Sequence, residues 1–529
     1  MNINIPISWT KVATTSDFDS KTHKIVRVGK KQIVLFKRQD EFYACNNRCP
    51  HEGYPLSEGT LSSECVLTCN WHNWKFDLAS GDNLTDGDRL RVYPLELRGD
   101  EIWLDVSEAP AAERQQSALT NLQDALTRHE YDRMAREIAR LDKAGGDPLE
   151  AIRQAIHWSH DHFEYGMSHA YAAAADWLTL RDKVAASEAE KLAPVVEVMG
   201  HIAWDTLREP RFPYSDGVED YDGDQLVQAI EDEDEARALA FVRGGLRNGL
   251  SYSDLQSDLA RAALAHLNDF GHSAIYTVKI GELIEHLGEE VTEPLALALV
   301  RGMIFARRED LIPEFRKYAE NLGKWDYQGQ ETVASADFFG KSVNKSMART
   351  LKCSADPKAL YDALLGALAQ QMLAFDLTFQ ESKNNQVDDN ITWLDFTHGI
   401  TFSNAVRHLC EAQPALWPQG LLQMACFIGR NSSYLGDQEC GGDWQVEDPV
   451  TFIENSKRGL FDHSQFEYIV ACHIVKLTYA VGDEVAAAPD APWVGDITSA
   501  LNRFLHSPLK RKHVIRTAQQ ALDFVARED

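Results

Sequence analysis

The sequence predicts a multidomain α+β protein, with a small N-terminal all-β domain, a polar linker and a large all-α domain. Residues 24–48 and 90–106 alternate apolar with polar side chains and contain turn residues, which is typical of short, half-buried strands. From about residue 118 onward, apolar residues recur at i, i+3 and i+4, the spacing of an amphipathic helix. We therefore expect a β domain at 1–107, a linker at 108–117 and a helical domain at 118–529.

Length and composition support a folded chain with more than one core. The chain has 529 residues, whereas a single hydrophobic core stops growing at roughly 250–300 residues. Asp and Glu (81) outnumber Lys and Arg (53), which gives a net charge of −28 that repels nucleic-acid phosphates and anionic membranes. We expect neither nucleic acid nor a membrane as a partner.

Cysteine usage and the N-terminal residues bear on the cellular compartment. The sequence contains no run of 18 apolar residues, and its start lacks the basic and apolar regions of a signal peptide, so a cytoplasmic location is expected. Nine cysteines without a secretory signal favour thiols or metal ligands over a disulfide framework. Four of the nine lie between residues 45 and 69, which makes this segment the first candidate for a metal site.

Two short motifs in that segment each offer one thiol and one imidazole. The first is Cys49-Pro-His51, and 17 residues later comes the second, Cys69-Asn-Trp-His72. A Rieske [2Fe-2S] cluster needs this ligand set, because two thiolates hold one iron and two neutral imidazoles hold the other. A zinc site built from the same four residues is the alternative. With its flanking residues, the segment from about residue 5 to 106 resembles the Rieske family.

This resemblance also implies a subtype. Respiratory-complex Rieske proteins carry an extra cysteine in each ligand loop, joined as a disulfide, at the places occupied here by Tyr54 and Trp71. They also supply Ser and Tyr hydroxyls to the cluster, where this chain has Trp74 and Phe76. A low potential, like that of Rieske ferredoxins and oxygenases, is therefore expected. The family usually has Gly near the second loop, but Asn73 tolerates the same left-handed backbone angles.

The helical region contains histidines that recur with carboxylates. HDHFEY (160–165) is repeated as HSQFEY (463–468), and DFGH (269–272) as DFTH (395–398). If these segments are helical, each carboxylate lies three or four residues from its histidine on the same face. Helical bundles build dimetal sites from such side chains, so we predict a non-haem iron site that holds two ions, with a single ion as the alternative. The predicted ligands are His160, Glu164, Asp269, His272, Asp395, His398, His463 and Glu467.

Further histidines follow these segments at His169, His408 and His473. His408 and His473 lie ten residues after the preceding candidate, which on a helix is about 15 Å of rise and a different face, so neither can bind the same ion as that candidate. We expect these three to be structural, to face substrate or to lie beside the ligands.

The segment Gly271-His272-x-x-Ile275-Tyr276, with the other histidine-bearing helices, resembles the questin oxidase-like family, whose members are helical oxidases that act on polyketides. The resemblance spans at most residues 150–480. It implies an oxidase activity and assigns no residue a role.

Together these features predict an oxidoreductase, a non-haem iron oxygenase or oxidase. A low-potential Rieske cluster would feed electrons to the iron site, which would activate O2 and oxidise a small organic substrate. The sequence has no P-loop and no dinucleotide fingerprint, so an external reductase or ferredoxin must supply the electrons. The alternatives are a Rieske electron carrier or a redox sensor with a non-catalytic helical docking domain. The substrate stays open, as does a homo-oligomer in which a neighbouring subunit supplies the electron.

Overall fold

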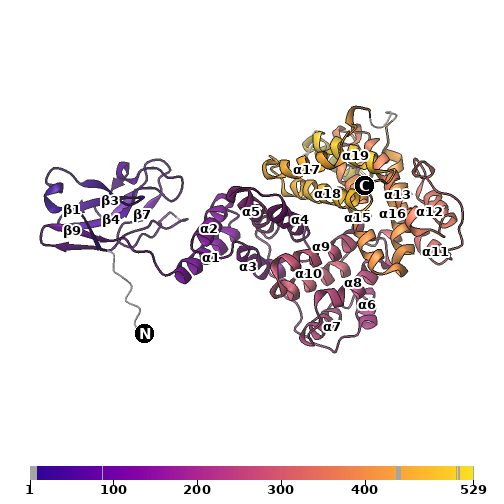
Figure 1. Ribbon diagram of the computed structural model, residues 1–529, viewed down its shortest axis with the longest axis horizontal. Helices are drawn as coiled ribbons and strands as arrows, with labels where there is room; N and C mark the ends of the chain where they lie inside the picture. Colours follow the sequence, from indigo (N-terminus) through magenta and orange to yellow (C-terminus); the bar gives the residue numbers. More distant parts are fainter. Residues whose placement is uncertain (1–8, 86, 437–441, 508, 510–512, 528–529) are drawn as a thin grey trace. The chain divides into compact units, whose positions relative to one another are not determined.

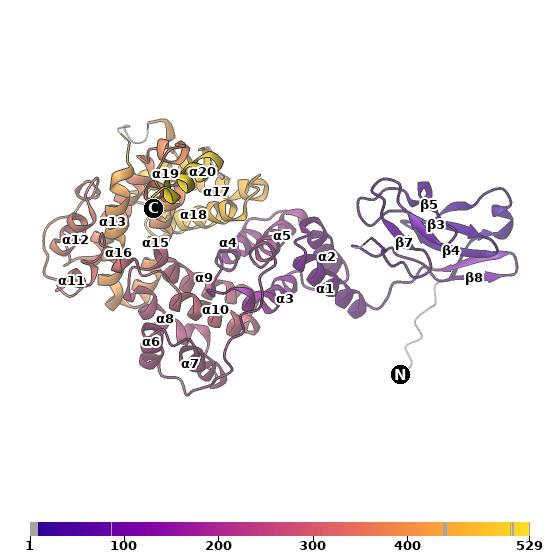
Figure 2. The same ribbon diagram turned by 180° about the vertical axis from the view of Figure 1, so that it is seen from behind.

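The computed structural model describes residues 9–85, 87–436, 442–507, 509 and 513–527. These residues form two compact units. The first contains the chain up to Ala125 together with Glu130–Gly146, and the second contains Leu126–His129 and the chain from Asp147 onward. The predicted order of a small β domain followed by a large helical region is confirmed (Figures 1 and 2).

The strands of the first unit form three antiparallel sheets, in the orders β1-β9-β8, β2-β3-β4 and β5-β6-β7. Hairpins connect β2 to β3 and β3 to β4, as the alternating segment 24–48 predicts. The strand bounds are β1 Trp9–Thr14, β2 His23–Val28, β3 Lys31–Arg38, β4 Glu41–Asn46, β5 Thr60–Leu61, β6 Val66–Thr68, β7 Lys75–Asp77, β8 Leu95–Arg98 and β9 Glu101–Asp105.

Strand β3 is central to this unit because both of its faces are covered. Successive side chains of a strand point to opposite faces, so Val34 and Phe36 enter one core while Ile33 and Leu35 enter another. The core around Val34 also contains the two motif cysteines, Cys49 and Cys69, and all of these side chains are buried. The core therefore supports the loops that carry the candidate cluster ligands.

Two helices, α1 (Ala111–Thr127) and α2 (Tyr131–Lys143), belong to the first unit. Helix α1 begins inside the segment 108–117 that the sequence suggests is a linker. The buried carboxylate of Asp88, in the β domain, accepts hydrogen bonds from Arg133, Arg136 and Arg140 of α2 at 3.1, 3.0 and 3.2 Å. A buried charge of this kind must be paired, and such long-range pairing is not visible in local composition.

The second unit is helical. Its helices up to residue 304 are α3 Glu150–Ser159, α4 His169–Lys183, α5 Glu188–Asp205, α6 Gly223–Glu231, α7 Glu235–Arg247, α8 Tyr252–Ala265, α9 His272–Leu287 and α10 Thr292–Ile304. The later helices are α11 Tyr318–Leu322, α12 Val343–Lys352, α13 Pro357–Leu373, α14 Thr378–Glu381, α15 Trp393–Ala412, α16 Trp417–Asn431, α17 Pro449–Gly459, α18 Tyr468–Ala487, α19 Val494–His506 and α20 Val514–Val525. No helix in the described part of the chain is long and apolar enough to cross a membrane.

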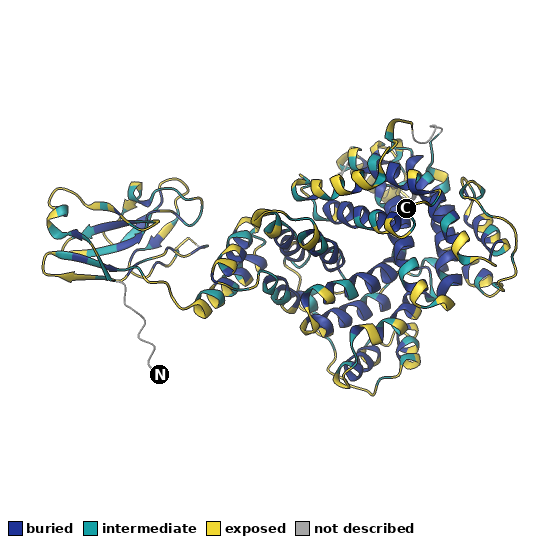
Figure 3. Cartoon of the chain, viewed as in Figure 1, coloured by how far each residue is buried: buried dark blue, intermediate teal, exposed yellow. Residues whose placement is uncertain are grey.

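Four helices form a closed ring in the middle of this unit. Helix α4 packs on α9, α9 on α15, α15 on α18, and α18 on α4. Ala172–Ala175 of α4 are fully buried, and their small side chains let neighbouring helices approach closely. Most of α9, α15 and α18 is also buried, which Figure 3 shows as dark blue ribbon. Polar side chains on these helices are therefore enclosed by protein.

Candidate functional sites

The two motif loops of the first unit have the same backbone geometry. In the first loop the Cys49 N–H donates to Tyr54 O and the Gly53 N–H to Cys49 O; in the second, the Cys69 N–H donates to Trp74 O and the Asn73 N–H to Cys69 O. The fifth residue of each loop is left-handed, with φ of 76° at Gly53 and 61° at Asn73. The prediction that Asn73 substitutes for glycine in this turn is confirmed.

These turns direct one imidazole from each loop toward a common point. The Nδ1 atoms of His51 and His72 lie 3.1 Å apart. Cys49 and Cys69 are buried beneath the two imidazoles, in the core that contains Val34 of β3. Burial raises the pKa of the Cys49 thiol to about 11, so an unpaired thiolate is disfavoured and a bound cation would stabilise it. Two thiols below and two imidazoles above are the donors that a Rieske cluster requires.

Aromatic rings cover the two imidazoles. Trp74 stacks on His51 at 4.4 Å between ring centroids, and Trp71 stacks on His72 at 5.1 Å. Tyr54 packs edge-on against Trp71 at 5.5 Å. The two positions that carry the disulfide cysteines in respiratory Rieske proteins are thus joined here by an aromatic contact. Trp71 remains 57% exposed, which makes it part of the surface beside the predicted cluster.

In the second unit, each helix of the central ring contributes one histidine to a cluster: the half-buried His169 of α4 and the buried His272 of α9, His398 of α15 and His473 of α18. His398 Nε2 lies 2.9 Å from His272 Nε2 and 3.4 Å from His473 Nε2. Ring nitrogens of His169, His398 and His473 all lie within 4.8 Å of one another. We call these residues the four-histidine cluster.

The remaining nitrogens of the cluster are held by other groups. The Nδ1 atoms of His398 and His473 donate to the carbonyls of Leu394 and Ile469, at 2.5 and 2.6 Å. Because Nδ1 carries the proton in this tautomer, each Nε2 lone pair points into the cluster.

The other two histidines have side-chain partners at Nδ1. His272 Nδ1 lies 3.3 Å from a carboxylate oxygen of Asp269, and His169 Nδ1 lies 3.3 Å from the hydroxyl of Tyr276. The buried Nε2 atom of His169 has no hydrogen-bond partner.

The surroundings keep these imidazoles neutral. Burial lowers the pKa of all four histidines. Lys476, one turn after His473 on α18, is also buried and without a hydrogen-bond partner at Nζ, and burial lowers its pKa as well. His169 and His272 are the first residues of their helices, where the positive helix end further disfavours an imidazolium. Neutral imidazoles are the form that binds metals.

Comparison with known proteins identifies the N-terminal domain. The family model of the Rieske [2Fe-2S] domain matches residues 8–94. The chain belongs to the Rieske family through this domain. It is 38% identical over 79 residues to the 3-phenylpropionate/cinnamic acid dioxygenase ferredoxin subunit of Escherichia coli K12, covering 15% of this chain and 74% of that protein.

Two other proteins resemble the chain over a similar length. The ferredoxin component of the alkene monooxygenase system of Xanthobacter autotrophicus Py2 is 26% identical over 117 residues, which is 21% of this chain and 96% of that protein. Among solved structures, the ferredoxin of carbazole 1,9a-dioxygenase from Nocardioides aromaticivorans IC177 covers 19% of this chain and 98% of its own, with 22% identity and a TM-score of 0.18.

The Rieske domain allows a prediction about its potential. Phe76 is fully buried in the cluster core and, like Trp74, has no hydroxyl with which to stabilise a reduced cluster. We expect a reduction potential on the order of −150 mV, at the low end of the Rieske range. Redox titration followed by EPR measures it, and Phe76→Tyr, which adds a hydroxyl, should raise it. A wild-type value near about +300 mV would contradict this reasoning.

Two nitrogen separations in the four-histidine cluster fall in the range expected for ligands of one metal ion. Metal–imidazole bonds of about 2.0–2.1 Å, at angles of about 90–110°, place two ligand nitrogens about 2.9–3.4 Å apart. The Nε2 separations of 2.9 and 3.4 Å around His398 fall in this range. The unpartnered Nε2 of His169 is also explained by a cation at this point.

The structure corrects part of the predicted ligand set. His272 and His398 come together and Asp269 contacts His272, but His160 and His463 lie outside the cluster. Helix α3 ends at Ser159, and His160 stacks on Tyr214 at 5.7 Å. His463 lies before α18 and faces Glu197 at 3.4 Å.

Because the segments 160–165 and 463–468 lie largely outside α-helices, the assumed i, i+4 pairing fails there. Glu164 is exposed in the loop before α4, and Glu467 precedes the first residue of α18. Asp395 has the predicted helical position, but it accepts from the Thr392 N–H at the start of α15 and from Arg430, each at 2.7–2.8 Å. Its side chain therefore fixes the helix start instead of joining the cluster.

His169 and His473 were not predicted as ligands, although each follows one of the repeated segments. The sequence predicts that His463 and His473 cannot bind the same ion. The structure agrees with this, because His473 lies in the cluster and His463 lies outside it. A signal was present in the sequence: His473 and Lys476 stand in the otherwise apolar run of α18, where unpaired polar residues are costly. His169 directly precedes the alanine run of α4.

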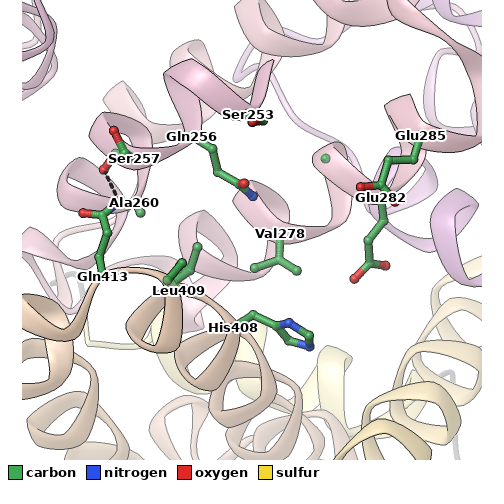
Figure 4. A pocket seen from close by; sticks show the side chains of 12 residues that line it. Ser253, Gln256, Ser257, Ala260, Val278, Glu282, Glu285, His408, Leu409 and Gln413 are labelled. Carbon is green, nitrogen blue, oxygen red and sulfur yellow. Dashed lines mark hydrogen bonds between the residues drawn. The ribbon is translucent and has the colours of Figure 1, made fainter. Parts of the chain in front are cut away.

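Two pockets adjoin the central helices. One, of about 320 Å³, is lined by His169 and His272 of the cluster and by residues of α10 and the loop before α4. The other, of about 390 Å³, lies between α8, α9 and α15, and Figure 4 shows Gln256, Val278 and His408 around it. None of the four clustered histidines lines this second pocket. His408, which pairs with Asp483 at 2.7 Å, is therefore separate from the cluster.

Proposed function

We propose that the protein is an oxidoreductase in which a low-potential Rieske cluster supplies electrons to a non-haem iron held by the four-histidine cluster. At that iron, dioxygen would oxidise a small organic substrate. The observation that carries this proposal is the convergence of neutral imidazoles from the four helices of the ring: ring nitrogens of His169, His398 and His473 lie within 4.8 Å of one another, and His272 contacts His398. A structural role alone leaves the buried Nε2 of His169 without a partner.

Iron is the metal that best matches both parts of the chain. Imidazole ligands suit zinc, copper, iron and nickel. A Rieske domain delivers single electrons, which zinc cannot accept, so its presence in the chain favours a redox-active ion. Ring nitrogens of His169, His398 and His473 share one location, His272 contacts His398, and Asp269 adds a carboxylate beside His272. We therefore propose one iron ion instead of the two that sequence repeats suggest.

The neighbouring residues hold the ligands in their metal-binding form. Asp269 accepts from His272 Nδ1 and so directs the Nε2 lone pair of that ring toward the metal position. Burial works to raise the pKa of Asp269, but the hydrogen bond from His272 and the charge of Arg307 bring that pKa below its ordinary value. Asp269 thus stays ionised. The hydroxyl of Tyr276 contacts His169 Nδ1 and is enclosed with it.

The pocket beside His169 and His272 is the proposed substrate site. Its volume of about 320 Å³ lies at the small end of the range for ligand pockets, about 300–1,000 Å³. Its lining is mixed: Met167, Phe270 and Leu299 are among the apolar side chains, and Asp269, Ser273 and Arg307 join the two histidines as polar members. Such a surface suits a small molecule that has both apolar and polar groups.

Electrons must reach the Rieske domain from another protein. Its relatives include proteins named as ferredoxin components of a monooxygenase system and of a dioxygenase. By analogy, we propose that an external reductase or ferredoxin reduces this cluster. The exposed ring of Trp71 beside His72 offers the donor an apolar contact.

Metal and sulfide analysis of the full-length protein tests the proposal. We expect about two acid-labile sulfides and about three irons per chain, because the cluster accounts for two irons and the helical site for one. Mössbauer spectroscopy should resolve the third iron from the cluster pair. Two irons with two sulfides, and no metal in the helical unit, would instead support an electron carrier or redox sensor.

A further inference from the structure

A line of aromatic side chains runs from the surface of the helical unit toward the four-histidine cluster. Trp204, at the end of α5, is 54% exposed. Its ring lies 6.4 Å from that of Tyr468, the first residue of α18. Tyr468 in turn stacks on His201 of α5, at 5.4 Å and an interplanar angle of 13°. His201 is only 4% exposed, so three rings lead from solvent into the interior.

Hydrogen-bonding groups at the inner end of this line lead to the residue before His169. His201 Nε2 lies 3.4 Å from a carboxylate oxygen of Asp205, and the same oxygen accepts from the hydroxyl of Ser168 at 2.6 Å. Ser168 caps α4 and is the residue before His169. On the other side, Tyr468 lies on the helix that carries His473. The rings therefore approach two of the four histidines.

Packing alone does not account for this arrangement. Because the Trp204 indole stays half exposed, it contributes little hydrophobic stabilisation. Burying His201 beside Asp205 has a desolvation cost that apolar residues would avoid. His129, from the segment Leu126–His129, packs on both Trp204 and Tyr468, at 5.2 and 5.8 Å, and so fixes the rings at the surface.

The proposed substrate pocket opens to the surface at residues other than Trp204. Its exposed aromatic residues are Tyr165 and Phe305, which pack together at 5.7 Å. A protein bound there would cover the substrate entrance. The Trp204 side leaves that entrance free, because none of Trp204, Tyr468 and His201 lines the pocket.

We propose that Trp204, Tyr468 and His201 form the route by which electrons enter the four-histidine site, with Trp204 as the contact for the reduced Rieske domain. This inference rests on the proposed function. The donor surface offers a matching exposed ring in Trp71, which stacks on the cluster ligand His72. Closely spaced aromatic rings shorten the gaps that an electron must cross, and transfer falls steeply as such gaps widen.

The electron balance of this step is simple. The reduced cluster, with one ferrous and one ferric ion, would return to two ferric ions, and a ferric ion held by the four histidines would become ferrous. One electron moves, no bond forms or breaks, and no proton is required. The Rieske domain that donates it belongs either to the same chain or to a second copy of it.

The test uses full-length, metal-loaded protein without oxygen or substrate. A flash-generated deazaflavin radical gives the cluster one electron, and visible absorption with freeze-quench EPR follows its reoxidation. Trp204→Ala should slow reoxidation, whereas Trp204→Phe, which keeps a ring, should slow it much less. Likewise, Tyr468→Leu should slow reoxidation more than Tyr468→Phe, which keeps a ring.

Phe466→Ala is the matched control, because Phe466 is 84% exposed and lies two residues before Tyr468. Reoxidation at the wild-type rate in Trp204→Ala, or equal slowing in Phe466→Ala, would overturn the route. A wild-type cluster that is never reoxidised would overturn the proposed function itself. If the rate constant of cluster reoxidation does not depend on protein concentration, the donor belongs to the same chain or to a stable oligomer. If this rate constant rises in proportion to protein concentration, the donor belongs to a second copy.

Discussion

Replacing His398 by alanine is expected to remove the metal from the helical unit while the Rieske cluster remains. His398 lies between two other ligands, since its Nε2 is 2.9 Å from that of His272 and 3.4 Å from that of His473. Losing it removes the central donor. Changing a group that only supports a ligand costs about 10- to 100-fold in metal affinity, so loss of a ligand should cost at least about 100-fold. The measurement is iron content per acid-labile sulfide.

The same experiment distinguishes the two ligand sets. His160→Ala and His463→Ala should retain the helical metal, because these rings lie outside the cluster, against Tyr214 and Glu197. Asp269→Asn should weaken iron binding by about 10- to 100-fold, since it leaves the ligands in place but loosens His272. Iron loss in His463→Ala with retention in His398→Ala would contradict the site described above.

The Rieske domain was predictable because its information is local. Both ligands of each loop lie within four residues, and the turn that presents them depends on one left-handed position per loop, Gly53 and Asn73. The supporting strands also follow from alternation within single segments, as in β3. The contact of Asp88 with α2 could not be predicted, because the carboxylate and its arginines are more than 40 residues apart.

The helical site was only partly predictable for the opposite reason. Its four ligands come from four helices and depend on which helices pack together, which the hydrophobic period does not specify. The repeats did identify the correct regions, since His169 and His473 follow the repeated loop segments and His272 and His398 end the other pair. The assumption that each carboxylate shares a helix with its histidine failed where α3 ends at Ser159 and α18 begins at Tyr468.

Without a metal, the buried nitrogens of the cluster destabilise the helical unit, and a bound metal ion would offset that cost. Three buried imidazoles, the half-buried His169 and the amine of Lys476 lie inside the ring of helices, where His169 Nε2 and Lys476 Nζ have no hydrogen-bond partner. Such groups are costly to bury, and a bound cation would satisfy the unpartnered nitrogen. Metal loading should therefore stabilise the helical unit by mass action as well as enable its chemistry.

Gly271→Ala is expected to cause the largest loss of stability among simple substitutions near the site. Residues Asp269, Phe270 and Gly271 are all left-handed, with φ of 39°, 53° and 75°, and this turn places His272 at the first position of α9. A Cβ at Gly271 would lie 2.3 Å from a ring carbon of Phe402. Left-handed backbone costs an alanine about 1–2 kcal/mol, and overpacking costs about 1–3 kcal/mol.

The sum, about 2–5 kcal/mol, should lower the midpoint of thermal unfolding and displace His272 from the metal position. Gly340→Ala provides the control, because Gly340 has a similar φ of 68° but nothing lies within 4 Å of an added Cβ. That variant should lose only the backbone contribution, about 1–2 kcal/mol, and keep its full iron content. Equal destabilisation of the two variants, or full iron content in Gly271→Ala, would show that contact with Phe402 does not position His272.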